Sequence, residues 1–285
     1  MSQTTISYEF FPPKNDAMAE SLWEAVPALM AYGPKYMTCT YGAGGSTKGG
    51  TLETLQKMRT MTDIPLAAHL SFLSTTKADL DEYLGKLWDN GVHHIVALRG
   101  DLPKGTSFDD FLGDEYYAYT YDFIEAIKEK NDFKVTVGAY PEKHPDAPTL
   151  DADIEHLRKK CHAGADAITT QYFFDNDVYF DFVEQCEKAG ITTPMQPGLM
   201  PIHDFENLKR FSARCDATIP QWLHEKFEGL ENGGEDAQKV ATDILILQAE
   251  DLVSKGVSHL HFYSMNKAPI TSEVCEALGH KAEAA

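Results

Sequence analysis

The sequence predicts an α/β protein that folds as a (β/α)8 TIM barrel, with an extra helical insertion before the last strand. Eight short β-rich runs alternate with helix-like segments at intervals of roughly thirty residues, as in repeated βαβ units. A barrel of eight such units needs roughly 250 residues, and the chain has 285. No GxGxxG pattern follows the first run, which argues against an open dinucleotide-binding sheet.

The predicted strands are mostly apolar through their middles, as expected of strands that are buried on both faces. They start at Thr5, Lys35, Ile64, His93, Phe133, Asp166, Thr193 and Ser258. Helix-like segments lie between them, and several end in glycine, the usual C-cap. They start at Ala17, Thr51, Lys77, Glu115, Asp151, Val178, His203 and Glu235. The connection from Ile219 to Asp236 predicts the extra helix, and no linker divides residues 1–285 into domains.

Composition and charge exclude several classes of protein. Hydrophobic residues make up 43% of the chain, which is enough for a core. The formal net charge of -19 argues against nucleic acid and anionic membranes as partners, so an anionic ligand needs a local basic patch. The five cysteines form no CxxC pair, and neither a signal peptide nor an apolar run of about 20 residues is present. These features predict a reduced, cytoplasmic protein.

Polar residues follow most of the predicted strands, at the end where barrel enzymes carry their active sites. This set contains Glu9, Thr40, His69, Arg99, Asp101, Tyr140, His144, Gln171, Pro197, Gly198, Tyr263 and Asn266. Its members are far apart in the sequence but are expected to form one ring in space. Buried strands do not otherwise need so many polar residues at their ends, which favours a functional site.

Each of these residues also has a plainer interpretation. A lone glutamate such as Glu9 near a strand end is usually solvated or salt-bridged. Asp101 is also compatible with a partner for Arg99 or a turn cap, and His69 with a satisfied core histidine. The pair His259 and His261 would point the same way from the last strand, but no carboxylate or cysteine is close in sequence. No metal site is predicted, and neither a GxSxG nor a Walker A pattern occurs.

Nine motifs in order make the chain resemble the methylenetetrahydrofolate reductase family, in its flavin-dependent, short bacterial form. They are EFFPPK at Glu9, TYGAGGST at Thr40, HL at His69, VALRGDLP ending at Pro103, AYPEKHPDA from Ala139, ITTQYFFD from Ile168, PGLMPI from Pro197, IPQW at Ile219 and HFYSMN from His261. The resemblance covers nearly the whole length. It implies a barrel with bound FAD that reduces 5,10-methylenetetrahydrofolate to 5-methyltetrahydrofolate in one-carbon metabolism and methionine biosynthesis. It also implies NADH or NADPH as donor, ping-pong kinetics, a homo-oligomer and no regulatory domain.

The resemblance also assigns roles to individual residues. Glu9 matches the general acid, Asp101 an aspartate beside both flavin and pterin, Gln171 a contact of pterin and nicotinamide, and Phe211 an aromatic that stacks on either ligand. Two further folate positions are Asn207 and Lys267, where glutamine and arginine are typical of the family. The implied cofactor contacts are Thr40, Tyr41, Ala43, His69, Arg99, Gly100, Asp101, Tyr117, Ala118, Tyr140, His144, Ala147, Asp153, His156, Lys159, Lys160 and Gln171. Lys48, Gly49 and Gly50 replace an arginine-rich stretch of the family, which suggests a looser loop there.

The implied chemistry gives a reason for a carboxyl group at position 9. Protonation of folate N10 opens the five-membered ring and leaves an electrophilic iminium at N5. An acid for this step must hold its proton near neutral pH, and burial beside Phe10, Phe11 and Pro12 is expected to raise the pKa of Glu9. A salt bridge would instead lower it. Arg99 or N–H groups near Gly100 are expected to steady the flavin, with Lys159 and Lys160 at its pyrophosphate.

Three rivals to this interpretation remain. A barrel aldolase or lyase without flavin would need a lysine at a strand end, and none is seen there. A folate-binding or flavin-storage protein without turnover would lack the acid at position 9, which is present. A related reductase with another electron donor stays open at this point.

Overall fold

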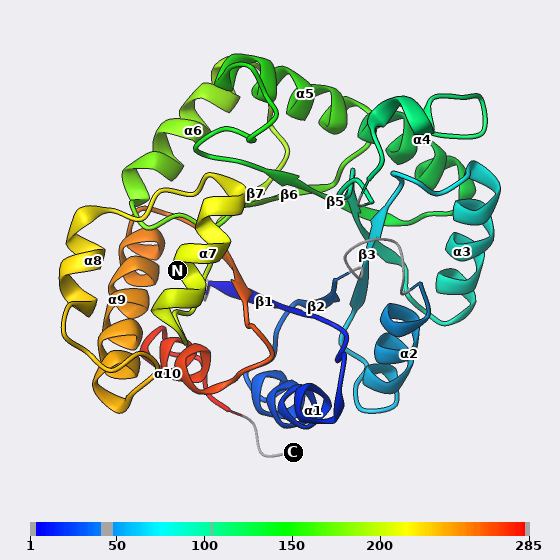
Figure 1. The fold of residues 1–285 in the computed structure, drawn as a ribbon. Coiled ribbons are helices and arrows are strands. Elements are labelled where there is room, and N and C mark those ends of the chain that lie inside the picture. The colour runs from blue at the N-terminus through cyan, green and yellow to red at the C-terminus, as the bar shows by residue number, and fades with distance from the viewer. Residues whose placement is uncertain (1–3, 41–47, 104, 283–285) are drawn as a thin grey trace.

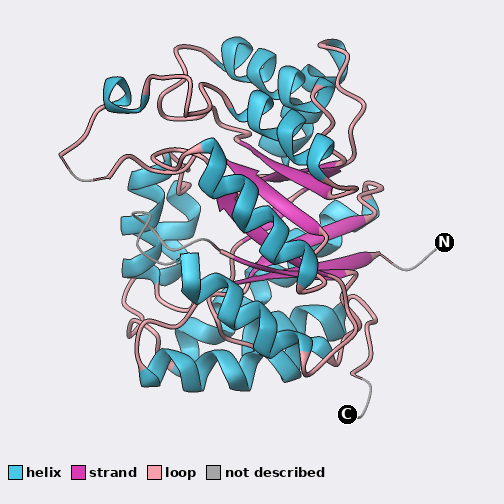
Figure 2. Cartoon of the chain, turned by 90° about the vertical axis from the view of Figure 1, so that its right-hand side faces the viewer, coloured by secondary structure: helices cyan, strands magenta, loops and turns pink. Residues whose placement is uncertain are grey.

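The structure, a computed structural model, describes residues 4–40, 48–103 and 105–282. Within them, parallel strands form a central ring that helices surround on the outside (Figure 1). The side view shows the strands inclined together in the middle of the molecule, between the helices (Figure 2). The predicted barrel is therefore confirmed.

The strands of the barrel follow one another in the order of the chain. The sheet runs β7-β6-β5-β4-β3-β2-β1-β9-β8, and every pair of neighbours is parallel. The strands are β1 (Thr5–Phe10), β2 (Tyr36–Cys39), β3 (Leu66–Ser71), β4 (His94–Leu98), β5 (Lys134–Ala139), β6 (Ala167–Thr170), β7 (Met195–Gln196), β8 (Gly198–Leu199) and β9 (His259–Tyr263).

The barrel closes through a seventh strand that Pro197 divides in two. Its first part, β7, pairs with β6, and its second part, β8, pairs with β9. Proline has no N–H to donate to a neighbouring strand, which interrupts the ladder at this position. Its carbonyl still accepts a hydrogen bond from the backbone N–H of His261 at 3.0 Å. The nine strand segments thus make an eight-stranded barrel.

The helices match the predicted positions with three differences. They are α1 (Asp16–Met30), α2 (Lys48–Arg59), α3 (Lys77–Asp89), α4 (Thr120–Lys130), α5 (Leu150–His162), α6 (Asn176–Lys188), α7 (Phe205–Cys215), α8 (Gln221–Phe227), α9 (Glu235–Ser254) and α10 (Pro269–Ala277), with a 3-10 turn at Phe108–Phe111. The insertion is α8. The differences are that α10 was not predicted, that α4 begins at Thr120 rather than Glu115, and that Lys48, Gly49 and Gly50 lie in the first turn of α2 rather than in a loop.

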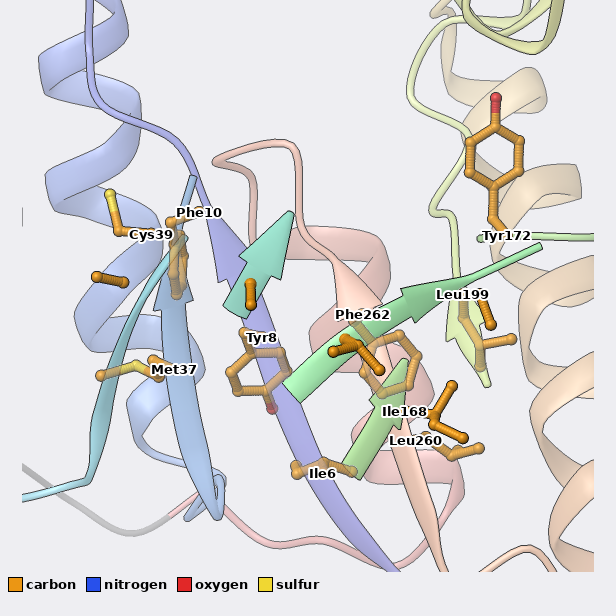
Figure 3. Close-up of a cluster of buried hydrophobic side chains, with 14 of the residues drawn as sticks. Ile6, Tyr8, Phe10, Met37, Cys39, Ile168, Tyr172, Leu199, Leu260 and Phe262 are labelled. Carbon is orange, nitrogen blue, oxygen red and sulfur yellow. The ribbon is translucent and has the colours of Figure 1, made fainter. Parts of the chain in front are cut away.

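Side chains of β1 alternate between the two faces of the barrel wall. Ile6, Tyr8 and Phe10 belong to the apolar core (Figure 3). The Tyr8 hydroxyl lies 3.2 Å from the Cys275 sulfur of α10. Successive side chains of a strand point to opposite faces, so Ser7 and Glu9 point into the barrel. Each interior side chain of β1 is in register with one of β9, Ser7 with His261 and Glu9 with Tyr263. The barrel interior is therefore polar on this side.

Candidate active site

Glu9 lies near the carboxyl end of β1, in contact with two histidines. Its Oε2 is 3.2 Å from Nε2 of His69 on β3 and 3.8 Å from Nε2 of His261 on β9. The same His69 nitrogen is 3.1 Å from the hydroxyl of Thr38 on β2. Both histidines are buried, whereas 19% of the Glu9 side chain remains exposed. Four strands therefore place a carboxylate, two imidazoles and a hydroxyl around one point of the rim.

The expectation that Glu9 has a raised pKa is wrong for the protein without ligands. Burial does act to raise this pKa, but the charge of His69 and the contacts with His261 and His69 outweigh it, and the pKa is lowered to about 2. The apolar neighbour Phe10 points to the other face of the wall, into the core, so it does not surround the carboxylate. Glu9 is an ionised, histidine-bound carboxylate at neutral pH.

This arrangement predicts a pH-dependent contribution of Glu9 to stability. Because the folded-state pKa is below the ordinary value of 4.5, the contribution is present above about pH 4.5 and is lost as the pH falls toward 2. Urea unfolding at pH 7, 5 and 3 should show the stability gap between wild type and Glu9→Gln narrowing with acid. Glu187→Gln, on the exposed side of α6, is the control. A gap that stays constant or widens at pH 3 would contradict the ion pair.

A second polar group lies beside Glu9 on the same rim. The Tyr263 hydroxyl donates to the carbonyl of Thr170 at 2.7 Å. Burial raises the pKa of Tyr263 well above its ordinary value, and the charges of Glu9 and Tyr140 act in the same direction. Burial likewise raises the pKa of Tyr140, whose surroundings include Cys215, a hydrogen bond with Gln171 and the charges of Arg99 and Asp101. Tyr263 thus lies between Glu9, with which it is in register, and the end of β6.

Arg99, Gly100 and Asp101 follow β4 at this rim. The Arg99 guanidinium pairs with Asp146 at 2.7 Å, not with Asp101, so the plainer interpretation of Asp101 as its partner is wrong. Gly100 has φ +90, and a Cβ there would meet the Ser71 hydroxyl at 1.8 Å. A side chain is therefore excluded at Gly100 by both backbone conformation and space. Asp101 itself is exposed.

The loop after β5 is fixed by its own hydrogen bonds. The His144 N–H donates to Asp153 of α5 at 2.8 Å, and the Lys143 ammonium donates to the carbonyls of His144 and Ala147. The His144 ring lies edge-on to Tyr140, with centroids 4.6 Å apart. Burial, and then the charge of Arg99, lower the pKa of His144. These contacts hold three predicted cofactor residues, His144, Ala147 and Asp153, in one unit.

The remaining predicted cofactor residues lie farther out, over α4 and α5. The ring of Tyr117 packs on Phe72 and Phe123, and Ala118 beside it is exposed. The Lys159 ammonium lies 5.6 Å over the Tyr121 ring. His156 on the same helix is exposed and lies 6.3 Å from the ring of Tyr119.

The two lysines of α5 do not point the same way. Lys159 is exposed, whereas the Lys160 ammonium turns inward and donates to the carbonyl of Gly138 at 2.6 Å. In this conformation the Lys160 ammonium is engaged by the backbone, and the placement of both lysines at the FAD pyrophosphate stays a prediction. Lys159 is left as the cation at the surface.

The predicted folate residues lie on and beside α7. Phe211 is 40% exposed, and Tyr172 of the β6 end fixes α7 through its hydroxyl, 3.1 Å from Ser212. Asn207 is exposed in the first turn of this helix, and its amide donates to Asp204. Burial and then the charge of Lys267 lower the pKa of His203 to about 4, so Lys267 lies near the start of the same helix.

The segment after β2 is only partly described. Thr40 is in place, since its N–H donates to the Phe10 carbonyl at 2.8 Å and its carbonyl accepts from Thr51. The predicted residues Tyr41 and Ala43 lie outside the described residues. Among those that are described, no group of three or more His, Cys, Asp or Glu side chains could hold a metal ion. None of the described helices combines the length and hydrophobicity needed to span a bilayer.

Sequence reasoning missed the residues that support this rim from below. His261 was set aside for lack of a carboxylate nearby in sequence, yet it contacts Glu9, and its Nδ1 is 2.7 Å from the Ser7 hydroxyl. The partner of Arg99, Asp146, was also missed. One signal was available: Thr5, Ser7 and Glu9 are polar at alternate positions of a strand whose other positions are apolar.

Comparison with known proteins agrees with this geometry. The family model for methylenetetrahydrofolate reductase matches residues 1–279. A 5,10-methylenetetrahydrofolate reductase of Escherichia coli is 35% identical over 277 residues, covering 97% of this chain and 91% of the relative. One from Buchnera aphidicola is 37% identical over 273 residues, covering 96% and 91%.

A solved structure shares the fold at low sequence identity. It is an uncharacterised Clostridium thermocellum protein described as binding two copies of 5-methyl-5,6,7,8-tetrahydrofolic acid. Its TM-score is 0.65 at 15% identity, covering 97% of this chain and 95% of that one. Together with the matches to the family model and to the bacterial relatives, the rim of polar residues leads to one conclusion: the chain belongs to the methylenetetrahydrofolate reductase family.

Proposed function

We propose that this protein reduces 5,10-methylenetetrahydrofolate to 5-methyltetrahydrofolate with FAD bound at the rim and NADH or NADPH as electron donor. The observation that carries the proposal is the position of Glu9, beside His69 and His261 and in register with Tyr263 on the rim that also carries Gln171. Bound FAD would supply the hydride chemistry between the nicotinamide and the folate, and the residues of the rim would hold and orient it. One stacking surface that serves both ligands in turn gives ping-pong kinetics.

The residues present fit FAD in two respects. Two cations, Arg99 at the rim and Lys159 on α5, provide positive charge on a chain of net charge -19. Arg99 would hold the edge of the isoalloxazine that gains negative charge, and Lys159 the pyrophosphate. The side chain of Ala118, beside Tyr117, is small and exposed. It would leave room for the part of FAD that joins the isoalloxazine to the pyrophosphate.

Glu9 would protonate N10 of the folate. In the free protein it is ionised, so it must gain a proton after the ligands bind. Stacked ligands would cover the 19% of its side chain that is exposed, and the added burial would raise its pKa toward that of an acid. Gln171 and the partly exposed Phe211 would orient the pterin, and Asn207 and Lys267 its glutamate tail.

Asp101 would tune the cofactor through its charge. It is exposed at the rim and acts on Tyr140 electrostatically, so it lies on the side where the isoalloxazine would sit. Asp101→Asn should therefore raise the reduction potential of the bound flavin, because a negative charge that opposes electron uptake is lost. Redox titration against a reference dye measures this, with Asp109→Asn as control. An unchanged potential in Asp101→Asn would contradict this position of the flavin.

Colour tests the proposed function most simply. We expect the purified protein to be yellow, to bleach anaerobically with NADH or NADPH, and to recolour with 5,10-methylenetetrahydrofolate. Comparing the two donors in single-turnover flavin reduction decides between them, and we expect NADH to be faster. A protein that binds no flavin would contradict the proposal, and one that bleaches only with another reductant would point to a related reductase with a different donor.

The setting of the enzyme is part of the same proposal. All five cysteines are free thiols, which fits a reducing, cytoplasmic environment. As a member of its family, the protein is proposed to form a homo-oligomer, and sedimentation velocity would test this. A monomer at micromolar concentration would contradict that part alone.

A further inference from the structure

A file of polar side chains runs through the barrel interior from Glu9 to the opposite end. From His261, whose Nδ1 is 2.7 Å from the Ser7 hydroxyl, the file continues to Nε2 of His259 at 2.8 Å. Nδ1 of His259 is 2.7 Å from the Thr5 hydroxyl. Ser7, His259 and His261 are buried, whereas Thr5 is exposed at the amino-terminal end of β1. The file therefore joins solvent on one end of the barrel to the carboxylate on the other.

We propose that His259, Ser7 and His261 form a relay that delivers a proton from the Thr5 end of the barrel to Glu9. The inference rests on the proposed function, because it supplies the proton that Glu9 would give to the folate. It meets a specific need: ligands that cover the rim also keep water from Glu9, which starts each turnover ionised. A route from the Thr5 end of the barrel stays open when bound ligands cover the rim.

Every step of the relay balances. Thr5 gives its proton to Nδ1 of His259 and regains one from water, while Nε2–H of His259 passes its proton to Ser7. Ser7 then gives its own proton to Nδ1 of His261, and Nε2–H of His261 protonates Glu9. The contact between His261 and Glu9, at 3.8 Å, must shorten for this last transfer. When the rim reopens, water protonates Nε2 of His261, one proton leaves at Thr5, and the first arrangement returns.

The relay requires an uncharged His259 that can carry its proton on either nitrogen. Burial, together with the charges of His261, Lys35 and Lys134, lowers the pKa of His259 to about 3, so the ring is neutral near pH 7. The Tyr36 ring lies parallel to it at 5.7 Å. The titratable and charged groups that face the file are Glu9, Lys35, Tyr36, His69, His94, Lys134 and Tyr263.

The direct test uses the tautomer of His259 in the protein without ligands. In one arrangement of the file His259 carries its proton on Nε2, and in the reversed arrangement it carries the proton on Nδ1. We expect 15N NMR of histidine-labelled protein to show both tautomers of His259 in exchange. Signals are assigned from single histidine variants. A His259 that is held in one tautomer in wild type overturns the relay.

Ser7→Ala removes the hydroxyl that joins the two imidazoles. We expect it to abolish the tautomer exchange and to slow the reaction of pre-reduced enzyme with 5,10-methylenetetrahydrofolate by about tenfold or more, as for loss of acid catalysis. Flavin reduction by NADH should be unchanged. Thr136→Val is the matched control, because it also removes a buried hydroxyl that binds a histidine, His94 at 2.8 Å, outside the file. It should leave both the exchange and the folate reaction as in wild type.

The outcomes separate the relay from the proposed function. Wild type that is yellow and reduces the folate, with Ser7→Ala reacting equally fast, overturns the relay and leaves the function intact. A protein without flavin or folate turnover contradicts the function, while the tautomer measurement still decides whether the file carries protons. If Ser7→Ala does not fold, wild-type NMR alone decides.

Discussion

Glu9→Gln should bind FAD and accept electrons from the nicotinamide at the wild-type rate, yet lose folate reduction by a factor of about 10² to 10⁴, the usual size of general acid catalysis. The amide has nearly the shape of the carboxyl group but no acidic proton to give to N10. Its neighbours His69 and His261 also lose their ionised partner. Anaerobic stopped-flow of each half-reaction separates the two effects.

Glu142→Gln is the control for this substitution. Glu142 lies in the loop after β5, where its carboxylate accepts the Thr218 N–H at 3.0 Å, and it is not among the predicted ligand contacts. This variant should retain both half-reactions. Folate reduction by Glu9→Gln at a rate near that of wild type would remove the acid role, and a loss of flavin reduction in it would show that Glu9 acts earlier.

Gly198→Ala should be strongly destabilising, lowering the free energy of unfolding by about 3 kcal/mol, the upper part of the usual range for overpacking. Gly198 begins β8, where the barrel closes, and its N–H donates to the Thr170 hydroxyl at 3.0 Å. A Cβ would lie 2.2 Å from the Thr170 carbonyl and 2.6 Å from the Tyr263 ring. The backbone oxygen cannot move without opening the β6–β8–β9 closure.

Gly85→Ala provides the contrast for this prediction. Gly85 is inside α3, and a Cβ there meets nothing within 4 Å. Alanine in a helix interior is more favourable than glycine by roughly 0.5–1 kcal/mol. Urea unfolding should therefore show opposite signs for the two variants. A Gly198→Ala variant as stable as wild type would contradict the close approach of residue 198 to the Thr170 carbonyl and the Tyr263 ring.

The fold was predictable because its signals are local. Each strand is short and bounded by polar or glycine-rich residues, and helices such as α5 begin at a capping residue, here Thr149 with its hydroxyl accepting from Ala152. Two features were not local. The helix α10 begins at Pro269 within a short, mixed segment after the last strand, and it is fixed by packing on α9 and α1. Pro197 splits a strand whose pairing on both sides depends on distant partners.

The arrangement of the candidate site was predictable in part, and its electrostatics were not. Strand ends meet on one rim in a barrel, which is enough to bring Glu9, Gln171 and Tyr263 together. The pKa of Glu9 depends on something else, the contacts with His69 and His261. Alternation along β1 decides that Phe10 faces the outer core while Glu9 faces the histidines. Sequence neighbours were therefore a poor guide to the surroundings of the carboxylate.

The central claim is that one rim holds the flavin and the folate with the Glu9 side chain at N10. A crystal structure of Glu9→Gln with FAD and 5,10-methylenetetrahydrofolate tests it most directly, because the inactive variant keeps the substrate intact. We expect the pterin to stack on the isoalloxazine beside Gln171, with the residue 9 side chain within hydrogen-bond distance of N10. A folate bound away from this rim, or with N10 on the side opposite residue 9, would contradict the claim.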